Sequence, residues 1–162
     1  MPAFPANPMS LAGRTIVITG AGQGIGRAIA LQSLALGANV TAVDRNAEAL
    51  DALAKETEAS RVLTVAGDVT DPELAPGVVS AAVERFGAVH GLVNNAGIVR
   101  AAMIDKMSLA TWNEVLNVHL TGAFHFLKAT GVHLIERAKA GDTAPGAIVN
   151  ISSDAGRRGT IG

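Results

Sequence analysis

TIVITGAGQGIG at residues 15–26 joins a short apolar run to a glycine-rich turn, and an Ala- and Leu-rich stretch follows at 24–36. This order predicts a buried strand, a tight turn and a helix. Glycines in such a turn let the backbone approach a pyrophosphate, and the helix N-terminus offers amide donors and a positive dipole end. A strand–helix turn without a ligand is the alternative interpretation. The candidate cofactor-binding residues of this turn are Gly20, Gln23, Gly24, Ile25 and Gly26.

An acidic residue at the end of the next apolar run indicates which dinucleotide is preferred. Asp44 stands eighteen residues after Gly26, close to the spacing of about 20 at which a carboxylate accepts hydrogen bonds from the adenosine ribose. The carboxylate would repel a 2′-phosphate, and Gln23 in the turn is neutral. Arg45 follows directly and would attract that phosphate, unless it is a solvated loop cation. We therefore expect NAD over NADP.

The remaining chain alternates short apolar runs with longer Ala- and Leu-rich stretches. Near-continuous apolar runs are typical of parallel strands buried on both faces, and their alternation with helices predicts βαβ units. We expect an α/β domain with a doubly wound parallel sheet (a Rossmann fold) over 11–162, after a flexible N-terminal arm at 1–10. Only five of the six strands of that fold are predicted, so we expect the C-terminal part to be missing and the sequence to be a piece of a longer protein. The predicted strands are 15–19, 39–43, 61–65, 89–93 and 147–151, and the predicted helices are 24–36, 47–58, 72–86 and 108–138.

The composition excludes several classes of function. The 162 residues carry 13 Lys and Arg against 14 Asp and Glu, a balance that argues against a nucleic-acid-binding surface. There is no Cys, and His90, His119, His125 and His133 are not paired at metal-ligand spacing, so we expect no metal site. No apolar run reaches the roughly 18 residues that a membrane helix needs, and the N-terminus lacks the pattern of a secretory signal. We expect a cytoplasmic protein that does not bind membranes.

Four further motifs follow the glycine turn in a fixed order. Asp68-Val69 comes after the third predicted strand, Asn94-Asn95-Ala96-Gly97 after the fourth, Asn117 lies in the long helix, and Ser153 follows the fifth strand. With these motifs the sequence resembles the short-chain dehydrogenase/reductases, which are NAD(P)-dependent oxidoreductases built on a Rossmann domain. The resemblance covers nearly all of the chain after residue 11.

The resemblance implies contacts between the later motifs and the cofactor. Asp68 would hydrogen-bond the adenine amino group beside the Val69 backbone, although an Asp that caps the following turn is the alternative. Asn94 would tie the central strand to the cofactor side. Ala96 and Gly97 would let the nicotinamide ribose lie close to the backbone.

The resemblance also implies two catalytic residues in this chain, and the family has two more in a motif that this chain lacks. Asn117 would bend the long helix and hold a water on a proton relay, unless it is a solvated helix residue. Ser153, with Ser152 as the nearby alternative, would hydrogen-bond the substrate carbonyl. The family's proton donor is a Tyr in a Tyr-x-x-x-Lys motif, and this chain has no Tyr. We therefore expect the full-length protein to be an enzyme and the 162-residue chain to be inactive; a non-catalytic NAD-binding module or an inactive fragment is the alternative.

The substrate is expected to be a small secondary alcohol or ketone. Residues 94–123 look most like the 3-oxoacyl-acyl-carrier-protein reductase branch, but dehydrogenases of sugars, polyols, steroids and hydroxyacyl-CoA share that look. Family members are typically tetramers or dimers joined through the long helix that carries Asn117. The resemblance therefore implies a homo-oligomer.

Overall fold

The computed structural model describes residue 7 and residues 9–159. Most of the predicted flexible arm at 1–10 lies outside the described residues. Five parallel strands form one sheet in the order β3-β2-β1-β4-β5, which confirms the expected doubly wound arrangement. The strands are β1 (Thr15–Thr19), β2 (Asn39–Asp44), β3 (Val62–Ala66), β4 (Gly91–Asn94) and β5 (Ala147–Asn150).

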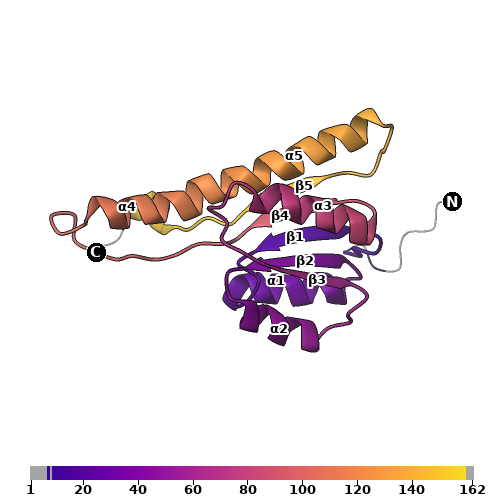
Figure 1. Ribbon diagram of the computed structural model, residues 1–162, viewed down its shortest axis with the longest axis horizontal. Helices are drawn as coiled ribbons and strands as arrows, with labels where there is room; N and C mark the ends of the chain where they lie inside the picture. Colours follow the sequence, from indigo (N-terminus) through magenta and orange to yellow (C-terminus); the bar gives the residue numbers. More distant parts are fainter. Residues whose placement is uncertain (1–6, 8, 160–162) are drawn as a thin grey trace.

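Helices cover both faces of the sheet, as Figure 1 shows. Helices α1 and α2 lie on one face, and α3 and the long α5 lie on the other. Helix α3 begins two residues later than predicted, because Pro72 belongs to the turn that precedes the helix. The helices are α1 (Gly24–Ala35), α2 (Ala47–Lys55), α3 (Leu74–Phe86), α4 (Leu109–Leu116), the π-helix η1 (Asn117–Gly122), α5 (Ala123–Lys139) and α6 (Ala155–Arg158).

The alternation of side chains along each strand divides the core into two clusters. Val17 and Ile18 are neighbours in β1, yet Val17 packs with α3 and α5 whereas Ile18 packs with α1 and α2. Both side chains are fully buried, as expected of a strand that is covered on both faces. Phe126 of α5 is also fully buried and anchors the long helix to its face of the sheet.

The long helix predicted at 108–138 is continuous but not uniform. Ser108 caps its N-terminus, and the Ser108 hydroxyl accepts a hydrogen bond from the Thr111 amide at 3.0 Å. The α-helix then gives way to π-helical turns at Asn117, where we expected a distortion, and resumes at Ala123. Helix α4 and the loop before it extend past the sheet (Figure 1). Within the described ranges, no helix is both long and apolar enough to cross a membrane.

Strand β5 forms an exposed edge of the sheet. All four of its residues are solvent-exposed, and the apolar Ile148 and Val149 are among them. Such an edge offers unpaired backbone groups and apolar side chains to another surface.

Candidate functional site

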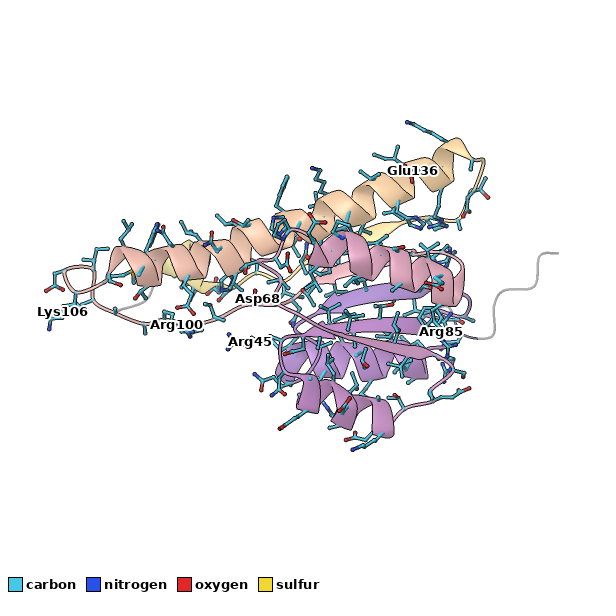
Figure 2. The ribbon with its side chains drawn as sticks, viewed as in Figure 1. Arg45, Asp68, Arg85, Arg100, Lys106 and Glu136 are labelled. Carbon is cyan, nitrogen blue, oxygen red and sulfur yellow. The ribbon has the colours of Figure 1, made fainter. Side chains whose placement is uncertain are left out.

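A cavity of about 320 Å³ lies where the carboxyl ends of the four strands β1 to β4 meet. This is the place at which doubly wound folds bind ligands. Arg45, Asp68 and Arg100 reach the same side of the molecule from three different loops (Figure 2). Nine of the eleven predicted cofactor-binding residues line the cavity: Gly20, Gln23, Gly24, Ile25, Asp44, Asp68, Val69, Ala96 and Gly97.

The glycine turn owes its shape to two close approaches. Gly20 has a φ of 66°, a conformation that favours glycine, and a Cβ there would lie 2.9 Å from the Ala96 Cα. A Cβ on Gly26 would collide with the Gly20 carbonyl and with the Asn95 amide group. Gly26 does not line the cavity; its role in the structure is to let α1 pack closely on the turn.

The start of α1 points unpaired amides at the cavity. Gln23 is the N-cap residue, and its side chain makes no capping hydrogen bond. The first amides of a helix have no partner within the helix, and those of Gly24 and Ile25 have none elsewhere in the described part of the chain. These donors, with the positive end of the helix dipole, suit an anionic group.

Asp44 is held rigidly at the end of β2. Its Oδ2 accepts a hydrogen bond from the Gly22 amide and its Oδ1 accepts one from the Asn46 amide, both at 2.9 Å. The glycine at position 22 is required because a Cβ would lie 2.9 Å from the carboxylate. The carboxylate is therefore fixed beside the glycine turn, with one lone pair of each oxygen left for another donor.

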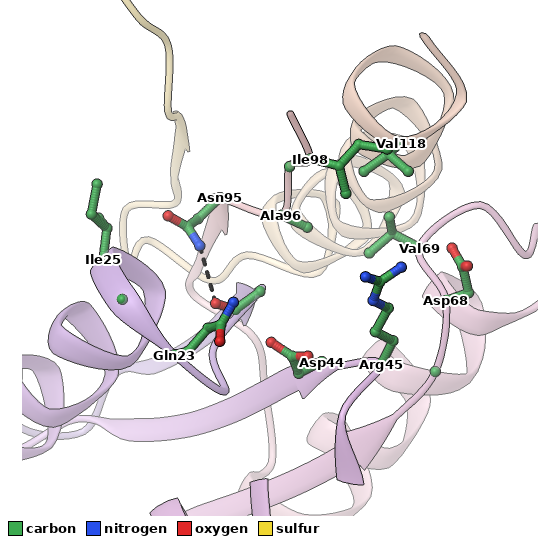
Figure 3. A pocket seen from close by; sticks show the side chains of 14 residues that line it. Gln23, Ile25, Asp44, Arg45, Asp68, Val69, Asn95, Ala96, Ile98 and Val118 are labelled. Carbon is green, nitrogen blue, oxygen red and sulfur yellow. Dashed lines mark hydrogen bonds between the residues drawn. The ribbon is translucent and has the colours of Figure 1, made fainter. Parts of the chain in front are cut away.

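Arg45 and Asp68 face the cavity from neighbouring strand ends. Figure 3 shows Arg45 between Asp44 and Asp68, with its guanidinium group toward Val69. The Asp68 Oδ1 accepts hydrogen bonds from the amide and the hydroxyl of Thr70, at 2.9 and 2.8 Å. These bonds, with a smaller contribution from the positive charge of Arg45, hold the pKa of Asp68 below its usual range. Asp68 thus caps the following turn, as the alternative interpretation had it, while it also lines the cavity.

Asn94 and Asn95 have different tasks at the end of β4. Asn94 is buried and does not line the cavity; its amide nitrogen donates to Asn150 of β5 at 2.9 Å and to the Ala123 carbonyl at 3.3 Å. Asn95 does line the cavity and donates to the carbonyls of Thr19 and Gly20 at 3.0 and 3.2 Å. The dashed line in Figure 3 marks the bond to Gly20. Sequence reasoning did not select Asn95 as a site residue, although it belongs to the Asn94-Asn95-Ala96-Gly97 motif.

The Gly97 backbone is in contact with a histidine. A Cβ on Gly97 would lie 2.6 Å from the Cε1 atom of His119, so the imidazole occupies the side of the glycine where a side chain would stand. The His119 Nε2 lies 3.0 Å from the Ile98 amide nitrogen and 2.8 Å from the Ile98 carbonyl oxygen. Ile98 and Val118, which sequence reasoning also missed, complete this wall of the cavity.

Comparison with known families gives the same answer as the motifs. The model of the short chain dehydrogenase family matches residues 14–162. The chain belongs to the short-chain dehydrogenase family.

The chain is similar to named proteins and to solved structures of this family. The chain is 38% identical over 156 residues to the 3-oxoacyl-[acyl-carrier-protein] reductase FabG of Thermotoga maritima, covering 95% of this chain and 61% of that protein. It is 38% identical over 147 residues to the D-threitol dehydrogenase of Mycolicibacterium smegmatis, covering 90% of this chain and 54% of that protein. The 3-ketoacyl-(acyl-carrier-protein) reductase from Brucella melitensis, complexed with NADH, superposes with a TM-score of 0.87 at 29% identity, over 94% of this chain and 62% of that chain. The chain thus spans between 54% and 62% of the length of these three relatives.

The two predicted catalytic residues of the chain lie outside the cavity wall. Asn117 is the first residue of η1 and is exposed. Ser153 lies three residues after β5, is exposed, and its hydroxyl accepts a hydrogen bond from the Ala155 amide at 3.2 Å. Irregular π-helical turns are frequent at functional sites, but the catalytic roles of both residues stay predictions.

Proposed function

We propose that this protein is an oxidoreductase that uses NAD in preference to NADP and interconverts a secondary alcohol and a ketone. The observation that carries this proposal is the fixed carboxylate of Asp44 beside the glycine turn in one cavity. A rigid acceptor and a set of unpaired helix amides are the groups that a ribose diol and a pyrophosphate require. The residues present therefore fit a dinucleotide.

The two ends of the cavity would hold different parts of the dinucleotide. Asp44 would accept hydrogen bonds from the adenosine ribose, Asp68 and the Val69 backbone would meet the adenine, and the amides at the start of α1 would hold the pyrophosphate. The wall formed by Ala96, Gly97 and Ile98 is then left for the nicotinamide half. When bound, the nicotinamide supplies or accepts the hydride.

The chain would supply only some of the groups that transfer a proton to or from the substrate. Ser153 would donate a hydrogen bond to the substrate carbonyl, and Asn117 would hold a water for proton transfer. The chain contains no Tyr, so a phenol acid is not among these residues. A positioned general acid contributes about 10²- to 10⁴-fold to a rate, and we propose that this 162-residue chain binds the cofactor with little turnover.

Titration with NADH and NADPH tests the proposal, with the fluorescence of the reduced nicotinamide as the signal. We expect NADH to bind more tightly than NADPH. If neither binds, the cofactor assignment fails; if NADPH binds more tightly, Arg45 rather than Asp44 decides the preference. Turnover is then measured with 3-oxoacyl thioesters and with polyols, since the named relatives act on these two kinds of compound. Binding without turnover in the full-length protein would favour the non-catalytic module.

The outer face of the long helix supports a homo-oligomer as a further part of the proposal. Four large apolar side chains fall on one helical stripe and are each more than 40% exposed: Leu120, Phe124, Leu127 and Ile135. Contiguous exposed apolar surface marks protein interfaces. Sedimentation equilibrium of the protein and of a Phe124→Glu variant tests this, because a monomer before the substitution would refute it.

A further inference from the structure

The wall at Gly97 and Ile98 is fixed by one side chain. Among the described residues, neither Gly97 nor Ile98 makes a hydrogen bond to another backbone group. In the same part of the chain, His119 is the one side chain that hydrogen-bonds the Ile98 main chain. The segment just before it is held differently, since the amides of Asn95 and Ala96 both donate to the Thr19 hydroxyl at 3.0 Å. The wall is therefore anchored to the sheet at its start and to the π-helix at its end.

The lack of a side chain at Gly97 leaves room for the His119 ring. Besides Cε1, both ring nitrogens of His119 would lie 3.3 Å from a Cβ at position 97, so the imidazole packs directly against the glycine. A ring at this distance sets how far the wall stands from η1. Val118, the neighbour of His119, lines the cavity beside Ile98 (Figure 3).

A second tie holds the loop beyond the wall without touching the cavity. Arg100 makes two hydrogen bonds to Glu114 of α4, at 3.0 and 2.6 Å. This ion pair is partly exposed, and exposed pairs contribute little to stability. The closer tie at His119 is the one that borders the cavity.

We propose that His119 is a positioning residue that holds the Gly97–Ile98 wall in place for the nicotinamide half of the dinucleotide. The inference rests on the proposed function, which assigns the adenosine half to Asp44 and leaves this wall for the other half. According to the tautomer of the ring, the His119 Nε2 either accepts a hydrogen bond from the Ile98 amide or donates one to the Ile98 carbonyl. Loss of the ring would let the wall move without disturbing the carboxylates at β2 and β3.

Two ligands that share one half test the assignment. ADP-ribose contains the adenosine and pyrophosphate parts, whereas NADH adds the nicotinamide. A His119→Ala variant is expected to lose about tenfold in NADH affinity, the effect of one hydrogen bond, and to keep its ADP-ribose affinity. His119→Gln, which can still donate to and accept from Ile98, should recover part of the loss. Thr121→Ala, an exposed change in the same π-helix, is the control and should leave both affinities unchanged.

A double-mutant cycle tests the contact itself. Gly97→Ala alone should weaken NADH binding because its Cβ meets the imidazole, whereas the same change in the His119→Ala background should cost less. Additive effects, equal losses for both ligands, or no loss would overturn the proposal.

Hydrogen exchange separates this inference from the proposed function. The Ile98 amide should exchange faster in His119→Ala than in the unaltered protein, with or without a ligand. Unchanged exchange overturns the tie. If the exchange changes but the unaltered protein binds neither NADH nor ADP-ribose, the proposed function and the positioning role both fail while the tie stands.

Discussion

Replacement of Asp44 by Ala should reverse or abolish the preference for NAD. The carboxylate is fixed by the amides of Gly22 and Asn46 at 2.9 Å, so its two remaining lone pairs stand ready for the two hydroxyls of the adenosine ribose. The substitution removes those acceptors, the negative charge and the support of the glycine turn together. The first two effects distinguish NAD from NADP, whereas the third weakens both.

The magnitude follows from the two ribose hydrogen bonds. A hydrogen bond to a charged group contributes about 1.5–3 kcal/mol, so NAD should lose roughly 3 kcal/mol, on the order of a hundredfold in affinity. For NADP the loss of turn support is offset by relief of the repulsion between the carboxylate and the 2′-phosphate, which is about 4 kcal/mol per charge pair at 4 Å before salt screening. The ratio of the two affinities should therefore shift toward NADP by at least about a hundredfold.

Calorimetric titration of NAD and NADP at one fixed salt concentration measures this ratio. Glu48→Ala is the matched control, since it removes an exposed carboxylate from the first turn of α2 and changes the net charge equally. The control should leave the ratio unchanged. An Asp44→Ala protein in which both affinities fall by the same factor would refute the reasoning, because it would mean that the carboxylate only supports the turn.

Three other predictions concern stability and turnover. Burial, together with nearby arginine charge, lowers the pKa of His90 and of His133 from 6.5. The folded state therefore binds fewer protons than the unfolded state, and the free energy of unfolding should fall as the pH drops below about 6.5. Urea unfolding at several pH values should show this fall, and His133→Gln should make it less steep, whereas an unchanged slope in that variant would contradict the prediction. Phe126→Ala should cost about 3–5 kcal/mol, because the ring is fully buried between α5 and the sheet, and a loss below about 1 kcal/mol in the same assay would contradict that packing. In the full-length protein, Ser153→Ala should lower kcat and leave NADH affinity nearly unchanged, and equal losses in steady-state kinetics and titration would assign Ser153 a structural role.

Local patterns were sufficient to predict the sheet. The branched apolar runs are long enough for strands and too continuous for a half-exposed sheet, so they indicated parallel strands with helices on both faces, and the observed strand order agrees. Their ends were less certain: the strand predicted to begin at Val89 begins at Gly91, because the Val89 amide donates to the His133 ring at 3.0 Å instead of joining the ladder. That acceptor lies forty-four residues away along the chain.

Some residues of the candidate site were predicted from the sequence, and others were missed. Gly20 and Asp44 were predicted because each belongs to a motif whose spacing follows a strand, and strand ends of a parallel sheet meet at one edge. Asp68 was predicted from the resemblance to the family. Asn95 and His119 were missed because their partners, Thr19 and Gly20 for one and Gly97 and Ile98 for the other, are distant in sequence. Only packing brings them together.

The sequence by itself determined the fold, the glycine turn and the carboxylate beside it, since these depend on periodicity and on short fixed spacings. Only the tertiary structure decided which atoms Asp44 bonds, why position 97 is a glycine, and that the long helix becomes a π-helix at Asn117. These features arise where separate elements meet. The physical reason is that close approach between distant segments depends on three-dimensional distances, which no local pattern of residues contains.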